Sequence, residues 1–153
     1  MHIREMSRRH IKQVAQIEQA CFSQPWSEKS LEAELDNPNA IFLVAEEDHI
    51  VAGYMGMHTV LDEGYIANIA ISQQFRRRGT ATLLTKRMME YAREKQLSFL
   101  TLEVRQSNEA AISLYRKMGF DQVGQRRNFY AKPCEDAILM TLYFKPQGRE
   151  DKR

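Results

Sequence analysis

Residues 74–84 read QFRRRGTATLL, in which three arginines and a glycine precede small residues and leucines. We expect a helix to begin at Gly79, and the first turn of a helix presents unpaired N–H groups and the positive end of the helix dipole. Both features favour a bound anion. The glycine and the short side chains of residues 80–82 would let a ligand approach the backbone, and the arginines raise the local positive potential. The stretch therefore suits a pyrophosphate.

This pattern is short, and it has a second interpretation as an exposed basic turn before a surface helix. Its spacing differs from that of a nucleotide P-loop, which ends in Gly-Lys-Ser or Gly-Lys-Thr. It also differs from the three-glycine fingerprint of dinucleotide-binding proteins. The stretch by itself leaves the phosphate site and the basic turn open.

Glu103 lies in the segment FLTLEVR, whose alternation predicts a strand with Leu100, Leu102 and Val104 on one face. The glutamate then shares the other face with Thr101 and Arg105. An unpaired carboxylate buried in a sheet costs several kcal/mol, on the order of the penalties known for isolated buried charges. We therefore expect Glu103 to form an ion pair or to line a wet cleft, and a position at the open end of the strand is the simpler alternative.

Tyr115 belongs to an apolar stripe at helical spacing that also contains Ala111, Leu114 and Met118. Such a stripe is typical of a helix that packs on a core. The residues by themselves favour packing for Tyr115, and its hydroxyl makes it a second candidate for acid-base chemistry.

The alternating patterns predict a mixed α/β (α+β) sheet with helices on both faces, in one domain over residues 1–146 with a polar tail over residues 147–153. The expected strands cover residues 2–5, two segments within 40–60 split at residues 47–49, 64–71 as a central strand, 98–104, 121–125 and 137–144. The expected helices end near residue 21, begin at Ser27 and end before Asn37, run over 79–95, and run over 108–119.

Composition excludes several classes of function. The 22 basic and 20 acidic residues leave a net charge of +2, which is too small to indicate a nucleic-acid partner. We find no apolar run of about 20 residues and no secretory signal, and we expect a cytoplasmic monomer without a membrane segment. The four histidines show no ligand spacing, so no metal is predicted, and Cys21 and Cys134 are expected to be free thiols.

Two longer segments, ANIAISQQFRRRGTATLL and LTLEVRQSNEAAISLYRKMGF, resemble the GNAT superfamily of acetyl-coenzyme A dependent N-acetyltransferases. Within it the chain resembles the ribosomal-protein-alanine N-acetyltransferases. The resemblance covers nearly the whole chain and is densest over residues 67–120. It implies a splayed, central mixed sheet of about seven strands and acetyl-CoA as cosubstrate. The coenzyme-binding residues that it implies are Ile69, Ala70 and Ile71 for the pantetheine arm, Arg77, Arg78, Gly79, Thr80, Ala81 and Thr82 for the pyrophosphate, and Asn108 further along.

The same resemblance implies that Glu103 is the general base and that Tyr115 is the proton donor. Glu103 would take the proton of the attacking amine, directly or through water, and Tyr115 would donate to the departing sulfur. The resemblance also implies an N-terminal alanine of a small-subunit ribosomal protein as the usual target. The segments QPWS and RRNFYAKPCED would recognise the peptide, with Trp26 and Tyr130 as candidate walls, although each aromatic residue has an alternative role in packing.

Two alternatives to this function stay open. The acceptor amine could belong to a lysine side chain or to a small molecule such as a polyamine or an aminoglycoside. A non-catalytic module that binds acyl-CoA or associates with the ribosome would also use the same fold, but we would then expect Glu103 or Tyr115 to be replaced, and both are present. Direct amine attack needs no covalent enzyme intermediate, so Cys134 is not required as a nucleophile.

Overall fold

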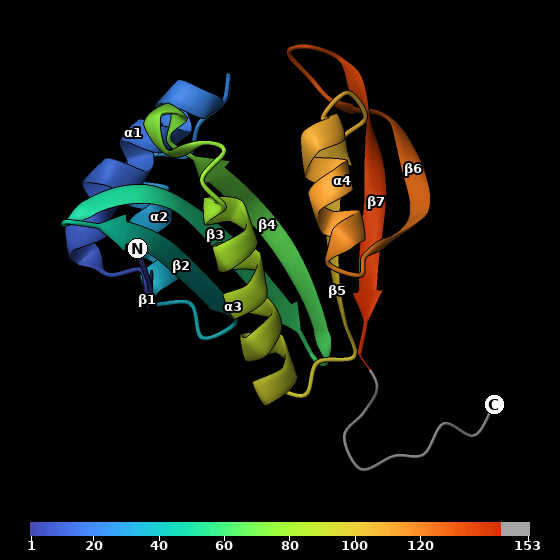
Figure 1. Ribbon diagram of the computed structural model, residues 1–153, viewed down its shortest axis with the longest axis horizontal. Helices are drawn as coiled ribbons and strands as arrows, with labels where there is room; N and C mark the ends of the chain where they lie inside the picture. Colours follow the sequence, from blue (N-terminus) through green and yellow to red (C-terminus); the bar gives the residue numbers. More distant parts are fainter. Residues whose placement is uncertain (145–153) are drawn as a thin grey trace.

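A computed structural model describes residues 1–144 of the chain, as seven strands, four α-helices and two short 3-10 helices (Figure 1). The strands are β1 (His2–Glu5), β2 (Ala40–Glu47), β3 (Ile50–Val60), β4 (Glu63–Ile71), β5 (Phe99–Arg105), β6 (Asp121–Tyr130) and β7 (Glu135–Tyr143). The helices are α1 (Ile11–Cys21), α2 (Glu28–Leu35), α3 (Thr80–Glu94) and α4 (Glu109–Lys117), and the 3-10 helices are η1 (Arg8–His10) and η2 (Gln73–Phe75). The predicted fold class is confirmed.

All seven strands form one sheet in the order β1-β2-β3-β4-β5-β7-β6. The predicted central strand, β4, is the fourth strand of this order. Neighbouring strands are antiparallel except β4 and β5, which are parallel and are joined by the crossover helix α3. The β2–β3 hairpin turns at Asp48 and His49, both with positive φ, which is the backbone conformation of a tight hairpin turn.

The sheet opens between its two parallel strands. β4 and β5 pair only over Glu63–Tyr65 and Phe99–Thr101, although each strand continues for several residues beyond this region. The later part of β4 therefore leaves the backbone groups that face β5 without a strand partner. Figure 1 shows α4 in front of β5 at the edge of this opening, with β5, β7 and β6 on one side of the opening and β1–β4 on the other.

Each face of the sheet carries its own apolar core. One core lies under α3 and α4 and includes Leu84, Met88, Leu102 and Tyr115. The other core lies under α1 and α2 and includes Val14, Leu31, Val44 and Tyr54. Alternation along β2 divides the strand between them, since Leu43 belongs to the first core and Val44 to the second.

A β-bulge changes the facing of side chains along β4. Gly56 of β3 pairs with Asn68, and the next residue, Met57, pairs with Ile66, so Ala67 is the extra residue. Ile66 and Ile69 therefore both pack on the core under α3. Asn68 consequently faces α1, where its side chain bonds to groups on α1 and β3.

The last hairpin corrects one part of the sequence-based prediction. Residues 126–136 were expected to form a loop, but β6 continues to Tyr130 and β7 begins at Glu135, with Tyr130 paired to Glu135. The register shifts between Arg126 and Tyr130, and Asn128 has a positive φ of 50°. Pairing resumes after this irregularity, which local sequence did not indicate.

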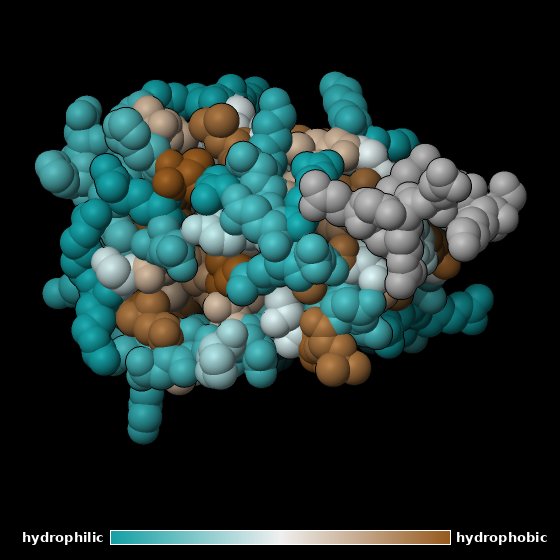
Figure 2. Space-filling view, turned by 90° about the horizontal axis from the view of Figure 1, so that it is seen from below, coloured by the Kyte–Doolittle hydropathy of each residue, from teal (hydrophilic) through white to brown (hydrophobic). Residues whose placement is uncertain are grey.

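The surface seen in Figure 2 is mostly hydrophilic, with apolar groups in separate patches. Single exposed apolar side chains such as Leu61 and Val123 are ordinary for a folded domain. Among residues 1–144, no helix is long and apolar enough to cross a membrane. The predicted tail, residues 147–153, lies outside the described residues.

Candidate active site

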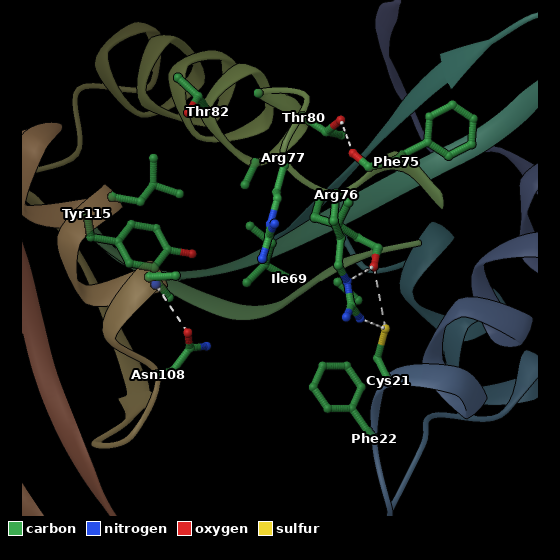
Figure 3. Close-up of a pocket in the computed structure, with 17 residues that line it drawn as sticks. Cys21, Phe22, Ile69, Phe75, Arg76, Arg77, Thr80, Thr82, Asn108 and Tyr115 are labelled. Carbon is green, nitrogen blue, oxygen red and sulfur yellow. Dashed lines mark hydrogen bonds between the residues drawn. The ribbon is translucent and has the colours of Figure 1, made fainter. Parts of the chain in front are cut away.

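The first cavity lies where β4, the start of α3 and α4 meet, and has a volume of about 620 Å³ (Figure 3). The predicted coenzyme residues that line it are Ile69, Ala70, Ile71, Arg77, Gly79, Thr80, Ala81, Thr82 and Asn108. Of the coenzyme residues expected from sequence, only Arg78 is absent from the lining. We call this the coenzyme cavity.

The start of α3 has the geometry of an anion site. Gly79 is its N-cap residue with a left-handed φ of 78°, and a Cβ added there would meet no atom within 4 Å. The approach to the backbone is therefore open. Arg77 also has a positive φ, of 63°, which is uncommon for a residue with a side chain and is a form of strain that clusters at functional sites. Thr80 is almost fully buried, and its hydroxyl lies 3.4 Å from the carbonyl oxygen of Phe75, to which it donates.

The three arginines before this helix point in different directions. Arg77 points into the coenzyme cavity in Figure 3. Arg76 lines the cavity edge, where it donates to the carbonyl oxygen of Ile71 at 3.2 Å and to Sγ of Cys21 at 3.5 Å. The side chain of Arg78 instead pairs with Glu47 at 2.9 Å on the other side of the turn.

A second cavity of about 550 Å³ adjoins the first. Its walls come from the end of α1 and the segment after it, from β4, from β5, from α4, and from the end of β6 with the turn after it. Six residues line both cavities: Cys21, Phe22, Ile69, Asn108, Ala111 and Tyr115. We call the second space the acceptor cavity, and it contains Glu103, Trp26 and Tyr130 in its walls.

Tyr115 lies at the junction of the two cavities. It is the buried residue of α4, with 2% of its surface exposed, and its ring packs edge-on against Phe120 at 5.4 Å between ring centroids. The side chain points from α4 into the coenzyme cavity (Figure 3). Burial, and to a smaller extent the nearby Tyr130, raises the pKa of Tyr115 well above its ordinary value, so the hydroxyl keeps its proton.

Glu103 occupies the wall of the acceptor cavity and also forms an ion pair. Leu102 and Val104 on either side of it are buried in the core, as the alternation predicted. The carboxylate lies 3.2 Å from Nε of Arg126 on β6. Arg105, which was expected on the same face of the strand, pairs with Glu135 at 3.2 Å. One third of the Glu103 side chain remains exposed, which leaves the carboxylate accessible from the cavity.

The two aromatic candidates combine packing with cavity walls. Trp26 is half-buried against the second core, with its ring 6.0 Å from that of Phe42, and it also lines the acceptor cavity. The guanidinium of Arg105 lies 4.4 Å from the ring centre of Tyr130. Burial first, and then the charge of Glu103, raises the pKa of Tyr130 to about 12.

Asn108 caps α4, with its Oδ1 accepting from the N–H of Ala111 at 3.2 Å. Its side-chain amide keeps two N–H donors beside both cavities. Among residues 1–144, no group of three His, Cys, Asp or Glu side chains could hold a metal ion.

Sequence reasoning gave no role in the site to several wall residues. Among them, Cys21 and Phe22 line both cavities, and Glu18 and Asn68 line the acceptor cavity. The segment CFSQPWS was part of the resemblance, so it gave a signal for the first pair. Neither Glu18, within an ordinary amphipathic helix, nor Asn68, next to an unrecognised bulge, gave a local signal.

The fold and the paired cavities define an acetyltransferase of the GNAT class. Residues 11–120 match the acetyltransferase (GNAT) family, and the chain belongs to this family. Acetyl-CoA is the acetyl donor that the family uses.

Individual relatives narrow the comparison. The chain is 38% identical to the [ribosomal protein bS18]-alanine N-acetyltransferase of Salmonella typhimurium, over 83% of this chain and 86% of that protein. It is 34% identical to the protein of the same name from Escherichia coli K12, over 82% and 86% of the two chains. The crystal structure of the ribosomal-protein-S18-alanine N-acetyltransferase from Escherichia coli superposes with a TM-score of 0.86 at 28% identity, and covers 98% of this chain and 99% of that one.

Proposed function

We propose that this chain transfers the acetyl group of acetyl-CoA to the α-amine of the N-terminal alanine of ribosomal protein bS18. The observation that carries the proposal is the meeting of the two cavities at Tyr115, with Glu103 in the wall of the acceptor cavity. A donor in one space and an amine in the other would face each other across this junction. The named activity of the bS18-alanine relatives supplies the acceptor.

The coenzyme cavity fits a pyrophosphate-containing donor. The unpaired N–H groups of the first turn of α3 and the guanidinium of Arg77 would bind the phosphates. The free edge of β4 at Ile69–Ile71 would bond to an extended polar arm, in the way that one strand bonds to another. The amide N–H groups of Asn108 would bind further along the same arm. When bound there, acetyl-CoA supplies the activated thioester.

Glu103 and Tyr115 would divide the proton transfers between them. Glu103 accepts the proton of the attacking amine, directly or through one water. Tyr115 donates a hydrogen bond toward the departing sulfur. The ordinary pKa of tyrosine, ~10, already exceeds that of a thiol, ~8.5, by about 1.5 units or roughly 2 kcal/mol. Burial raises the pKa of Tyr115 further, so the tyrosine acts as a hydrogen-bond donor and full proton transfer is unfavourable.

The chemistry favours an α-amine as acceptor. A protein α-amine has a pKa of about 7.7–8.0 and lysine one of about 10.4, so neutralising lysine at pH 7 costs about 3.4 kcal/mol more. A carboxylate is a weak base in general, which suits the less basic amine. Acetylation of a lysine side chain or of a small amine is therefore the alternative result that the test below can detect.

The test is mass spectrometry of a peptide mixture incubated with the protein and acetyl-CoA. One peptide begins with alanine and contains a lysine, a second has the same sequence with a blocked N-terminus, and spermidine is the small-amine competitor. We expect acetylation on the alanine nitrogen alone. Acetylation of lysine or spermidine would show that the acceptor is not the N-terminal alanine. No acetylation in any arm would favour a non-catalytic module that binds acyl-CoA.

We further propose a single catalytic domain over residues 1–146 that works as a cytoplasmic monomer, without a metal or a direct nucleic-acid partner. The near-neutral charge balance supports the absence of a direct nucleic-acid partner. Light scattering should give the monomer mass of 17.9 kDa, and activity should survive EDTA. A dimer mass, or loss of activity that zinc or magnesium restores, would contradict this proposal.

A further inference from the structure

Glu18 is a buried carboxylate beside the acceptor cavity that the proposed chemistry does not use. It lies in the last turn of α1, exposes 1% of its surface and contributes to the cavity wall. A carboxylate in such a place is costly unless its oxygens accept hydrogen bonds. Its bonding partners therefore indicate what it does.

Three donors from three separate segments meet at this carboxylate. Oε1 accepts from the backbone N–H of Trp26 at 2.8 Å. Oε2 accepts from the hydroxyl of Tyr54 on β3 and from Nδ2 of Asn68 on β4, the latter at 3.3 Å. Asn68 also donates to the Tyr54 oxygen at 2.9 Å. One side chain thus joins the end of α1 to β3, β4 and the segment that carries Trp26.

The segment over residues 22–27 has little regular structure of its own. It lies between α1 and α2, and Phe22 within it is 42% exposed. Phe22, Ser23, Gln24 and Trp26 all line the acceptor cavity. Two hydrogen bonds tie this wall to other parts of the molecule: the bond from Trp26 to Glu18, and the bond from Oγ of Ser23 to the carbonyl oxygen of Lys132 at 3.0 Å.

Tyr54 supports the carboxylate from outside the cavity. It is fully buried, and the acceptor cavity lining does not include it. Burial, and then its hydrogen bond to Glu18, raises the pKa of Tyr54 far above its ordinary value. The hydroxyl thus remains a donor to Glu18 throughout the pH range of a cell.

We propose that Glu18 is a positioning residue that sets affinity for the acceptor, because its carboxylate holds the segment over residues 22–27 against β3 and β4. This inference rests on the proposed function only in that an acceptor amine enters this cavity. Loosening the carboxylate would release the backbone of Trp26 from the end of α1. The acceptor would then lose a wall, while the coenzyme cavity at the start of α3 would keep its shape.

The first test uses Glu18→Gln and Tyr54→Phe in the full chain. We expect the acceptor KM to rise about tenfold in Glu18→Gln and about threefold in Tyr54→Phe, as for loss of one charged or one neutral hydrogen bond. The Kd for acetyl-CoA should stay within twofold of wild type. Because Tyr54 is absent from the acceptor cavity lining, its effect on KM must pass through its two hydrogen-bond partners, Glu18 and Asn68.

Glu46→Gln is the matched control. Glu46 is also a buried glutamate, 5% exposed, and lies on β2 with Arg9 at 2.8 Å and His10 at 2.7 Å, outside both cavities. The hydrogen bond from Arg9 is the main cause that lowers the pKa of Glu46 to about 2. This variant should lower the melting temperature and leave the acceptor KM unchanged.

A second readout does not depend on activity. Trp26 is the single tryptophan of the chain, so acrylamide quenching of its fluorescence reports on the proposed wall. We expect the quenching constant to rise about twofold in Glu18→Gln and to stay constant in Glu46→Gln. In the double variant Glu18→Gln with Asn68→Asp, the side chain at position 18 becomes the donor and the side chain at position 68 the acceptor of their shared hydrogen bond. This variant should return the quenching constant and KM to within threefold of wild type.

The outcomes separate this inference from the proposed function. KM is measured with whichever acceptor the wild-type protein acetylates. If that acceptor is not an N-terminal alanine, the proposed function is wrong, but the role of Glu18 can still be tested. Unchanged quenching, an unchanged KM, or an equal rise of KM in Glu46→Gln would overturn the role of Glu18. If Glu18→Gln does not fold, the same criteria apply to Tyr54→Phe, and a protein that acetylates no acceptor overturns both proposals.

Discussion

The two cavities that meet at Tyr115 are built by different means. The coenzyme cavity depends on the backbone of one continuous stretch, from Ile69 to Thr82, with α4 opposite it. The acceptor cavity depends on side chains from five separate parts of the chain, among them Glu18, Glu103 and Tyr130. A site of backbone groups follows from local sequence, whereas a site of converging side chains exists only after long-range packing.

This difference predicts how each cavity responds to substitution. Backbone N–H groups survive most changes of side chain, so single substitutions around the coenzyme should have graded effects. The groups that would perform chemistry on the acceptor are single side chains, and their removal should be severe. The experiments below begin with the largest expected effect.

Glu103→Gln removes the proposed base. We expect kcat/KM to fall about 100-fold at pH 6.5, within the range known for general bases, and less than about tenfold at pH 9. The loss should shrink at high pH because the amine is then already neutral. Steady-state rates between these pH values check this, with Glu90→Gln on the exposed side of α3 as control. A loss independent of pH would remove the base role.

Tyr115→Phe removes the proposed donor and keeps the ring. We expect kcat to fall about 30-fold to 100-fold, since a positioned donor contributes on this scale, with the Kd for acetyl-CoA within twofold of wild type. Because the pKa of Tyr115 is raised, the wild-type rate should show no loss from its ionisation up to pH 10. Single-turnover kinetics measure the rate of the chemical step. A wild-type rate in Tyr115→Phe would show that Tyr115 only packs against the core.

Arg77→Ala and Arg78→Ala test the coenzyme side with adjacent residues of the same charge. We expect the first to weaken acetyl-CoA binding about tenfold, as for one charge-assisted hydrogen bond, and the second less than twofold. The reason is that Arg77 points into the cavity while Arg78 pairs with Glu47. Calorimetry measures the Kd for acetyl-CoA in both variants. Equal losses of affinity would show that only the total positive charge matters for binding.

Gly79→Ala should weaken acetyl-CoA binding less than Arg77→Ala does, with a loss of about threefold to fivefold in affinity. The left-handed φ strains any residue with a Cβ by about 1–2 kcal/mol, and the new methyl enters the open approach. Gly119→Ala is the control, since Gly119 also has a positive φ, of 105°, but lies outside the coenzyme cavity. Both variants should unfold more easily in urea, and equal coenzyme affinities in the two would place the phosphates elsewhere.

Local sequence indicated most of the elements and one part of the donor site, the start of α3. The alternation of β5 placed Leu100, Leu102 and Val104 in the core and Glu103 opposite them, and the structure agrees. The glycine and the small residues after it marked the start of α3, because the conformational freedom of a glycine and the exposed N–H groups of a helix end are local properties. Fold class and strand number follow from such patterns.

Tertiary structure decided the rest. The bulge at Ala67 turns Asn68 toward Glu18, and strict alternation from Ile66 would have placed it on the opposite face. Pairing with Glu47 takes Arg78 away from the cavity, and pairing across an irregular stretch extends β6 to Tyr130. Each of these outcomes depends on a partner distant in sequence, whose contribution to the free energy exists only once the chain has folded. Residue type and spacing could therefore indicate the donor site, while the acceptor site required the packed molecule.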